Sequence, residues 1–313
     1  MKKCMCCMRD YSEGVLECPL CGYSEAQMRN DIEEFPEALH PETILAGRFI
    51  LGRALSVSDF SVIYIAWDAL LQRRVAIREY FPIGLGTRRD ETGDIIFDTE
   101  QEQMFFERGK EIFEKEAALL NRNQDIDGIV HVYRTVRENN SSYIVMEYLE
   151  GSTLQDEMDS GEPMTRQQME DTVYQLAEII DTFHSRGIGH YNLSPDNIYR
   201  DENGKIRVTD FGDAKREVYR ILNRNANIMD LRYTAPEVLA GENAGYGSDL
   251  YSLGAIYYRM LTGKEPPQSK PRRKKKSGLR VNDLAAGEII EALTFPVLEM
   301  RPTNAADFIR SKM

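Results

Sequence analysis

The chain has 313 residues, of which 42% are hydrophobic and 29% charged, and its formal net charge is -12. This length allows a sizeable core and more than one folding unit, and the composition is that of an ordinary soluble protein. The negative charge disfavours non-specific binding of nucleic acid. No apolar run approaches the roughly 20 residues that span a membrane, and the apolar stretch of a signal peptide does not follow Met1.

All five cysteines lie within the first 21 residues. This distribution indicates a reducing cytoplasm rather than a disulfide framework. Two Cys-x-x-Cys pairs, separated by ten residues, have a spacing at which four thiolates can surround one Zn²⁺ tetrahedrally. The predicted zinc ligands are Cys4, Cys7, Cys18 and Cys21.

A zinc ribbon is therefore predicted over residues 1–24, with the metal supplying most of its stability, on the order of 10 kcal/mol. Cys6 is interpreted as a spare thiol, and the alternative for the whole segment is a redox-active tail. Because it contains few basic residues, the ribbon is expected to contact protein or to cap the terminus rather than to bind nucleic acid. The acidic, proline-bounded stretch that follows indicates a linker over residues 25–41.

Alternating apolar residues next predict a group of strands, the third of which ends at Pro82. An exposed hairpin turning at residues 91–94 and a segment with helical spacing of apolar residues follow. The expected elements are the strands Arg48–Leu55, Ser61–Asp68 and Val75–Pro82, the helix Glu102–Asn121, and the strands Val130–Val136 and Ser142–Tyr148.

The second half of the chain reads as mainly helical. Thr165 and Gln168 have the spacing of a capping box, which predicts a helix that ends near Arg186. A loop from residue 189 to 199 and a short strand then precede an Asp-Phe-Gly segment. The last helices are expected around Leu284–Leu293 and Thr303–Arg310.

The loop and the Asp-Phe-Gly segment resemble the catalytic segment of protein kinases, H-R-D-L-x-x-x-N followed by D-F-G. Residues that fit this layout are His190, Leu193, Pro195, Asn197, Asp210, Phe211 and Gly212. The strand V-A-I-R-E-Y-F-P at residues 75–82 is similar to V-A-I-K-E-Y-F-P in a subgroup of bacterial Ser/Thr protein kinases that often carry an N-terminal zinc ribbon. The resemblance implies an α+β, two-lobed kinase-like fold over residues 42–312, with a β-rich small lobe at 42–148 and a helical large lobe at 149–312.

Departures from the family pattern fall on residues used for phosphate transfer. The catalytic Asp is replaced by Asn192, the strand Lys by Arg78, and the three glycines of the first turn by Ser56, Ser58 and Ser61. Glu116 matches the helix Glu that pairs with the strand Lys. The resemblance further implies nucleotide contacts at Ala76, Glu147, Tyr148 and Tyr199, and Mg²⁺ ligands at Asn197 and Asp210.

Regulatory features are altered as well. The loop from Asp213 contains no Ser or Thr before Thr234, and the Arg that would bind a phosphate on this loop is Tyr191. Scaffold residues match the family, namely Asp249 and the pair of Glu237 with Arg301. The basic run at residues 270–276 is interpreted as a solvated loop or, alternatively, as a docking site for an anionic partner.

These observations predict a pseudokinase that acts in bacterial signalling by binding protein partners, with weak or no ATP binding. One alternative is an active, atypical ATP-dependent Ser/Thr protein kinase that uses Asp210, Asn197 and Arg78. Another is a zinc-ribbon adaptor for which the kinase fold is a platform. The expected cofactors are zinc and, for a nucleotide-binding protein, Mg·ATP.

Overall fold

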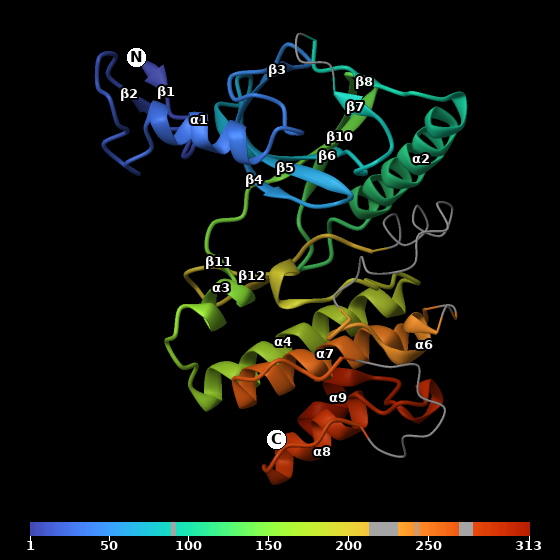
Figure 1. Cartoon of the computed structure of the whole chain (residues 1–313). Helices are drawn as coiled ribbons and strands as arrows, with labels where there is room; N and C mark the ends of the chain where they lie inside the picture. Colours follow the sequence, from blue (N-terminus) through green and yellow to red (C-terminus); the bar gives the residue numbers. More distant parts are fainter. Residues whose placement is uncertain (89–91, 213–230, 241, 243, 269–277) are drawn as a thin grey trace. The chain divides into compact units, whose positions relative to one another are not determined.

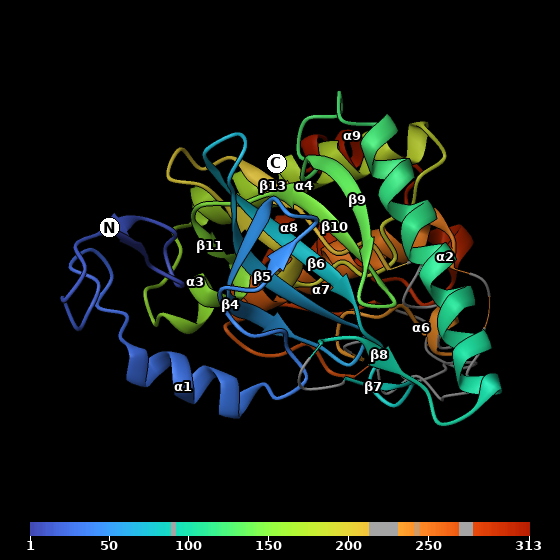
Figure 2. The same ribbon diagram turned by 90° about the horizontal axis from the view of Figure 1, so that it is seen from above.

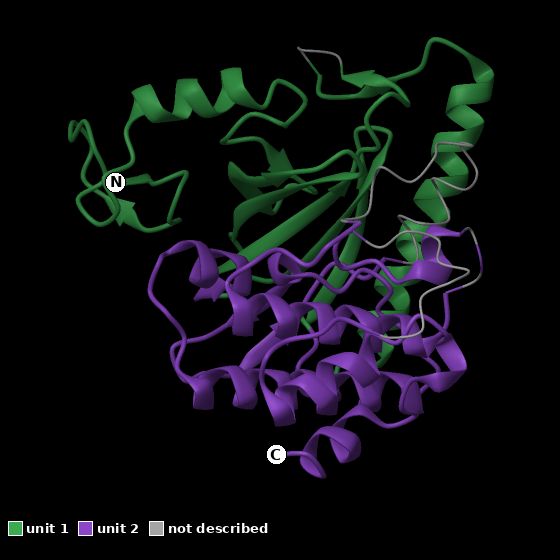
Figure 3. Cartoon of the chain, turned by 60° about the horizontal axis from the view of Figure 1, so that its bottom comes forward, with its two compact units in different colours: residues 1–124, 130–149, 220–222 green, residues 125–129, 150–219, 223–313 purple. Residues whose placement is uncertain are grey.

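A computed structural model describes the chain except for residues 89–91, 213–230, 241, 243 and 269–277. The basic run at 270–276, and all but the end of the loop that follows Asp-Phe-Gly, lie outside these described residues. The described parts form two compact units (Figure 3): unit 1 holds the described residues of 1–124 and 130–149, and unit 2 holds residues 125–129, 150–212 and the described residues of 231–313. Within the described part of the chain, no helix is both long and apolar enough to cross a membrane.

Unit 1 begins with a small hairpin, in which β1 (Lys2–Lys3) pairs antiparallel with β2 (Asp10–Tyr11). Helix α1 (Glu25–Glu34) follows, and its first turn is closed by a reciprocal capping box between Ser24 and Gln27. The sequence predicted a linker over residues 25–41, and the structure forms a helix over part of it. The linker was predicted from the acidic, proline-bounded composition alone, without the capping box of Ser24 with Gln27. This box pairs backbone amides that the start of a helix otherwise leaves without a partner.

A six-stranded sheet forms the body of unit 1, in the order β3-β4-β5-β6-β10-β9, and all neighbouring strands are antiparallel. Its strands are β3 (Ile44–Leu45), β4 (Phe49–Val57), β5 (Ser61–Asp68), β6 (Arg73–Tyr80), β9 (Val132–Glu138) and β10 (Ser141–Glu147). The five predicted strands are confirmed, with ends that differ by at most two residues. The predicted hairpin is also present, as β7 (Thr87–Arg88) paired with β8 (Ile95–Ile96).

Helix α2 (Glu100–Arg122) begins at a capping box between Thr99 and Glu102, and it confirms the helix expected here. It packs beside β9 and β10 (Figure 2). Its buried face includes Phe106 and Phe113, which contact the ring of Tyr80 on β6 at centroid distances of 4.8 and 5.5 Å. This aromatic contact fixes α2 against the strand that carries Arg78.

Unit 2 is mostly helical. A three-stranded sheet joins β11 (Ser152–Thr153), β12 (Ile198–Arg200) and β13 (Ile206–Val208). The other elements are α3 (Leu154–Asp159), α4 (Arg166–Ser185), the 3-10 turn η1 (Pro195–Asn197), α6 (Pro236–Leu239), α7 (Tyr246–Thr262), α8 (Leu284–Leu293), the 3-10 turn η2 (Leu298–Met300) and α9 (Ala305–Arg310). Helix α4 contacts α7 and α9, and α7 contacts α8 (Figure 1). The predicted capping box of Thr165 with Gln168 opens α4.

Candidate functional site

The polar loop before η1 is held by Asp249, a fully buried residue near the start of α7. Its carboxylate accepts hydrogen bonds from the backbone amides of His190, at 2.8 Å, and Tyr191, at 2.6 Å. Burial lowers the pKa of His190, whose ring contacts Phe211 at a centroid distance of 4.4 Å. These contacts give the loop and the Asp-Phe-Gly segment the fixed backbone expected from the kinase resemblance.

The scaffold pair of Glu237 with Arg301 is also formed. The guanidinium of Arg301 donates to both carboxylate oxygens of Glu237, at 2.7 and 2.8 Å, and both residues are buried. Ser248 donates to the same carboxylate at 2.7 Å. Although burial opposes ionisation, the hydrogen bonds from Arg301 hold the pKa of Glu237 below its usual value. A bidentate pair with a further hydrogen bond meets the conditions under which a buried ion pair is tolerated.

Three predicted site residues meet in this loop. The side-chain amide of Asn192 donates to the carboxylate of Asp210 at 2.9 Å and to its backbone carbonyl at 3.0 Å. The side-chain amide of Asn197 donates to the backbone carbonyl of Asn192 at 2.7 Å. The residue at the catalytic position therefore binds directly to the residue expected to hold Mg²⁺.

Close backbone packing makes this contact possible. A Cβ on Gly212 would lie 2.6 Å from the Cβ of Asn192, so only glycine fits beside it. Asp210 adopts a φ of +59°, which non-glycine residues rarely adopt. Such a conformation persists only where the surrounding contacts hold it, and here the Asn192 amide supplies two of them.

In unit 1, Arg78 on β6 is buried and its guanidinium is enclosed. It donates to Glu116 on α2 at 3.3 Å and to the hydroxyl of Ser61 at 3.1 Å. The rings of Phe60 and Phe113 lie 5.5 and 5.3 Å from its guanidinium carbon. The pair of Arg78 with Glu116 that the resemblance implied is therefore present, inside an aromatic pocket.

The serine turn, residues 56–61, joins β4 to β5 and is closed by its own side chains. The hydroxyl of Ser58 accepts from the amides of Phe60 and Ser61, at 3.3 and 3.1 Å, and donates to the Ser61 carbonyl. The amide of Ser58 also donates to that carbonyl, at 2.9 Å. Amides that a glycine-rich turn would direct to phosphate are thus already paired within the turn.

Residues after β6 fasten the serine turn further. The amide of Phe81 donates to the Phe60 carbonyl at 3.1 Å, and the amide of Ile83 donates to the Asp59 carbonyl at 2.9 Å. Phe60 is buried against Tyr80 at a centroid distance of 5.4 Å. The sequence analysis missed these contacts, although the Ser-x-x-Ser spacing of Ser58 and Ser61 is typical of a turn closed by side chains.

The remaining predicted nucleotide contacts lie on strands or at their ends. Ala76 on β6 pairs with Met146 on β10, and Glu147 ends β10 and is followed by Tyr148. In unit 2, Tyr199 lies on β12, where it pairs with Arg207 of β13. Their nucleotide contacts stay predictions.

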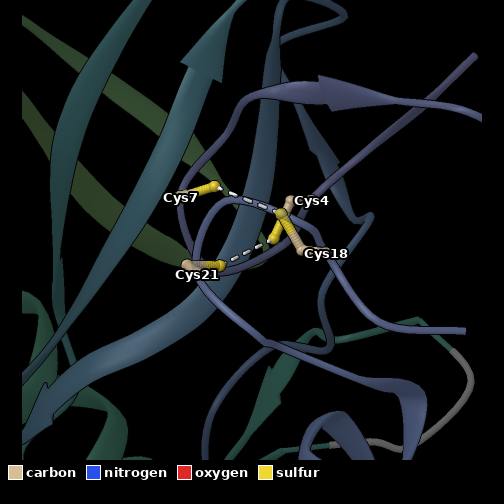
Figure 4. A group of neighbouring side chains, drawn as sticks. All are labelled: Cys4, Cys7, Cys18 and Cys21. Atoms are coloured by element: carbon tan, nitrogen blue, oxygen red, sulfur yellow. Dashed lines mark hydrogen bonds between the residues drawn. The ribbon is translucent and has the colours of Figure 1, made fainter.

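The four predicted zinc ligands form a compact group, the cysteine cluster (Figure 4), in which all four sulfur atoms lie within 4.8 Å of one another. The sulfur atoms of Cys4 and Cys21 are 3.6 Å apart, and those of Cys7 and Cys18 are 3.8 Å apart. With Zn–S bonds of 2.3 Å, the edge of a regular tetrahedron is about 3.8 Å. Both separations therefore fit a shared metal ion and exceed a disulfide bond, about 2.05 Å.

Burial and neighbouring backbone amides act in opposite directions on the pKa values of these thiols. Burial raises the pKa of the Cys4 thiol to about 12, against hydrogen bonds from the amides of Cys7 and Cys6. Burial also opposes ionisation of Cys18, but hydrogen bonds from the amides of Leu20 and Cys21 lower its pKa to about 7. Amides that stabilise thiolates suit a site in which a metal ion replaces the thiol protons.

The model of the protein kinase domain family matches residues 96–313, and the chain belongs to this family. The chain is 31% identical to a probable serine/threonine-protein kinase of Clostridium acetobutylicum over 225 residues. This alignment covers 72% of this chain and 31% of the relative. It is 30% identical, over 223 residues, to the serine/threonine-protein kinase PrkC of Bacillus subtilis, with 71% and 31% covered. The chain spans about a third of the length of these curated relatives.

Among solved structures, the fold is similar to that of the PpkA-294 apo form, with a TM-score of 0.75. The match covers 88% of this chain and 99% of that one at 24% identity, a level that shows the fold alone. The kinase fold expected from the sequence is thereby confirmed, whereas the zinc ribbon expected before it stays a prediction.

Proposed function

We propose that this chain is a pseudokinase, a kinase-family protein with impaired catalysis that acts in signalling by binding protein partners in the cytoplasm. The observation that carries the proposal is the hydrogen bond from the Asn192 amide to the Asp210 carboxylate, at 2.9 Å. An aspartate at position 192 would have no proton to donate at neutral pH, and two carboxylates this close would need a cation between them. With asparagine at position 192, the side chains of residues 192 and 210 form a hydrogen bond and need no cation between them.

Loss of the carboxylate also removes the general base. A neutral amide cannot usefully take the proton of a substrate hydroxyl, and removal of a positioned base costs about 10²–10⁴ in rate. Asn197 and Asp210 remain as oxygen donors for Mg²⁺. Mg²⁺ held by these residues would neutralise phosphate charge, but it would not accept the proton of the substrate hydroxyl.

Unit 1 supports the same proposal. Phosphate positioning in this family depends on turn amides and on the strand lysine. The amides of Ser58, Phe60 and Ser61 donate within the turn, and the Arg78 guanidinium is held by Glu116 and Ser61. Binding of a triphosphate would have to break these bonds, and this cost lowers the affinity for ATP.

Thermal unfolding in Mg·ATP tests the nucleotide part of the proposal. A site with micromolar Kd gains about 4 kcal/mol of stability at millimolar ligand, since the gain is RT ln(1 + [L]/Kd). We expect a Tm shift below about 1 °C at millimolar Mg·ATP, far less than a few kcal/mol would produce. Asp210→Ala, which removes a predicted Mg²⁺ ligand, should leave the small response unchanged, whereas stabilisation that saturates at micromolar Mg·ATP would contradict weak binding.

The cysteine cluster is proposed to hold one structural Zn²⁺ through Cys4, Cys7, Cys18 and Cys21. Support comes from the separations of the sulfur atoms, all of which lie within 4.8 Å of one another. Zn²⁺ with four thiolates has no open position, so the ion would supply stability rather than chemistry.

Elemental analysis of the purified chain should give one zinc per chain. Cys18→Ser should lose most of this zinc because three thiolates remain, whereas the matched Cys6→Ala variant should retain it in full. Stoichiometric zinc in Cys18→Ser, or its loss in Cys6→Ala, would refute the assigned ligand set.

A further inference from the structure

The first knuckle of the cysteine cluster, residues 4–8, packs directly on strand β4. Gly52 and Arg53 of β4 lie opposite the single residue Ile65 of β5, because the register shifts between Leu51 and Ala54. Such a bulge takes backbone groups out of the ladder. The amide of Arg53 instead donates to the carbonyl of Met5 at 2.8 Å, so the sheet and the knuckle share a backbone hydrogen bond.

Side-chain packing at Gly52 is equally close. A Cβ added to Gly52 would lie 2.3 Å from the Met5 carbonyl oxygen and 2.1 Å from the Met8 Cε atom. Met8 is buried and adopts a φ of +56°. Glycine at position 52 is therefore required for the knuckle to reach the strand.

Two charged contacts extend the interface to either side. The ammonium of Lys3 lies 3.8 Å from the ring centre of Trp67 on β5 and donates to the Met8 carbonyl. The guanidinium of Arg53 lies 3.8 Å from the carboxylate of Asp31 on α1, which also accepts from the Tyr23 hydroxyl. The cysteine cluster thus meets both strands that enclose the serine turn.

We propose that the cysteine cluster is a metal-dependent brace for β4 and β5. Metal held by the four thiolates fixes the Met5 carbonyl and the Met8 side chain, and these two groups hold the bulge at Gly52 and Arg53. Loss of the metal frees the knuckle and loosens the strand pair that carries the serine turn. This inference rests on the proposed zinc site but not on the pseudokinase assignment, and it gives the ribbon a function within the chain instead of only an adaptor role.

Trp67 reports on this coupling, since it is the only tryptophan in the chain. Chelation of zinc from the full chain should shift Trp67 emission as Lys3 leaves the ring, and one equivalent of added Zn²⁺ should restore it. Hydrogen exchange gives a second readout, because the Arg53 amide should be protected with zinc and exchange faster without it. Cys6→Ala should respond like the parent chain, and Cys18→Ser should start with the metal-free spectrum and not respond.

Gly52→Ala separates the coupling from the metal site. Its methyl group pushes the Met5 carbonyl away while all four thiols remain, so the variant should still bind zinc, with no response of Trp67 or of the Arg53 amide. Coupling is reciprocal, and its usual range is about 5–150-fold in affinity, so Gly52→Ala should weaken zinc binding at least about fivefold.

The possible results separate the two proposals. Zinc that leaves the parent chain without changing Trp67 emission or Arg53 exchange would overturn the brace and leave the zinc site intact. A parent chain that binds no zinc would refute both. Should Gly52→Ala fail to fold, the exchange of the Arg53 amide in the parent chain decides the question alone.

Discussion

Labelled ATP with Mg²⁺ is expected to yield no phosphate transfer, either to generic protein substrates or to the chain itself. In the proposed pseudokinase Asn192 supplies no carboxylate as general base, and the turn amides and Arg78 are engaged within unit 1. Positioning and electrostatic stabilisation act together in phosphoryl transfer, so these losses affect one reaction. Autophosphorylation by the unmodified chain, abolished by Asp210→Ala, would establish an active atypical kinase instead.

Asn192→Asp alone is expected to remain inactive. Residues that act as a unit are not additive, and restoring the base leaves the phosphates without a turn or a lysine to position them. The variant should nevertheless change in one measurable way. Its new carboxylate faces that of Asp210, so Mg²⁺ should raise its Tm more than it raises that of the parent chain.

Asn192→Leu is the matched control for this experiment, because it removes the amide without adding charge. It should show neither activity nor a gain in Mg²⁺ response. An Asn192→Asp variant without any added Mg²⁺ response would mean that the two side chains do not face each other as described.

Local sequence patterns predicted the elements that are determined by contacts between neighbouring residues. Thr165 with Gln168 and the apolar spacing of α2 are readable from a few neighbouring residues, and both helices form as expected. The kinase motif likewise located Asn192, Asn197 and Asp210 before any geometry was known. Short-range pattern was sufficient in each case because the determining contacts lie within one turn or one motif.

Contacts between distant segments that no family motif names were not predictable from local patterns. The hydrogen bond of Asn192 with Asp210 joins residues 18 apart through a close approach at Gly212. The bulge at Gly52 depends on contacts with Met5 and Met8, more than forty residues earlier in the chain. Such contacts depend on the packing of whole segments, which no periodicity encodes.

A buried polar network in unit 1 was missed for the same reason. Among the predictions made for this chain, a substitution in this network should lower the free energy of unfolding the most. Glu79 on β6 is fully buried, and its carboxylate accepts from the hydroxyls of Tyr64 and Tyr143 at 2.7 and 2.8 Å. The guanidinium of Arg88 lies 2.7 Å from the same carboxylate. Burial and the charge of Glu79 raise the pKa values of both tyrosines well above their usual range, so their hydroxyls stay protonated and donate.

Arg88 also ties two loops to this network. It donates to the carbonyl of Glu37 at 2.7 Å and to that of Gly93 at 3.0 Å, while the Leu39 amide donates to the Tyr64 hydroxyl at 2.9 Å. The segment before β3 and the hairpin of β7 and β8 are therefore anchored on one buried ion pair. A buried polar network fixes the arrangement of the segments that it joins, and removal of one partner from it is costly.

Arg88→Met is expected to lower the free energy of unfolding by about 3–5 kcal/mol, since it leaves the Glu79 charge buried without a cation. Arg186→Met is the matched control: its partner Asp125 is exposed, and the loss of such a surface pair should shift the unfolding midpoint much less than Arg88→Met does. Urea unfolding of both variants measures the difference as a shift in the midpoint. Adding Glu79→Leu to Arg88→Met should recover part of the lost stability, because the unpaired charge of Glu79 is then removed. Equal losses of unfolding free energy for Arg88→Met and Arg186→Met would show that the buried pair contributes no more than a surface pair.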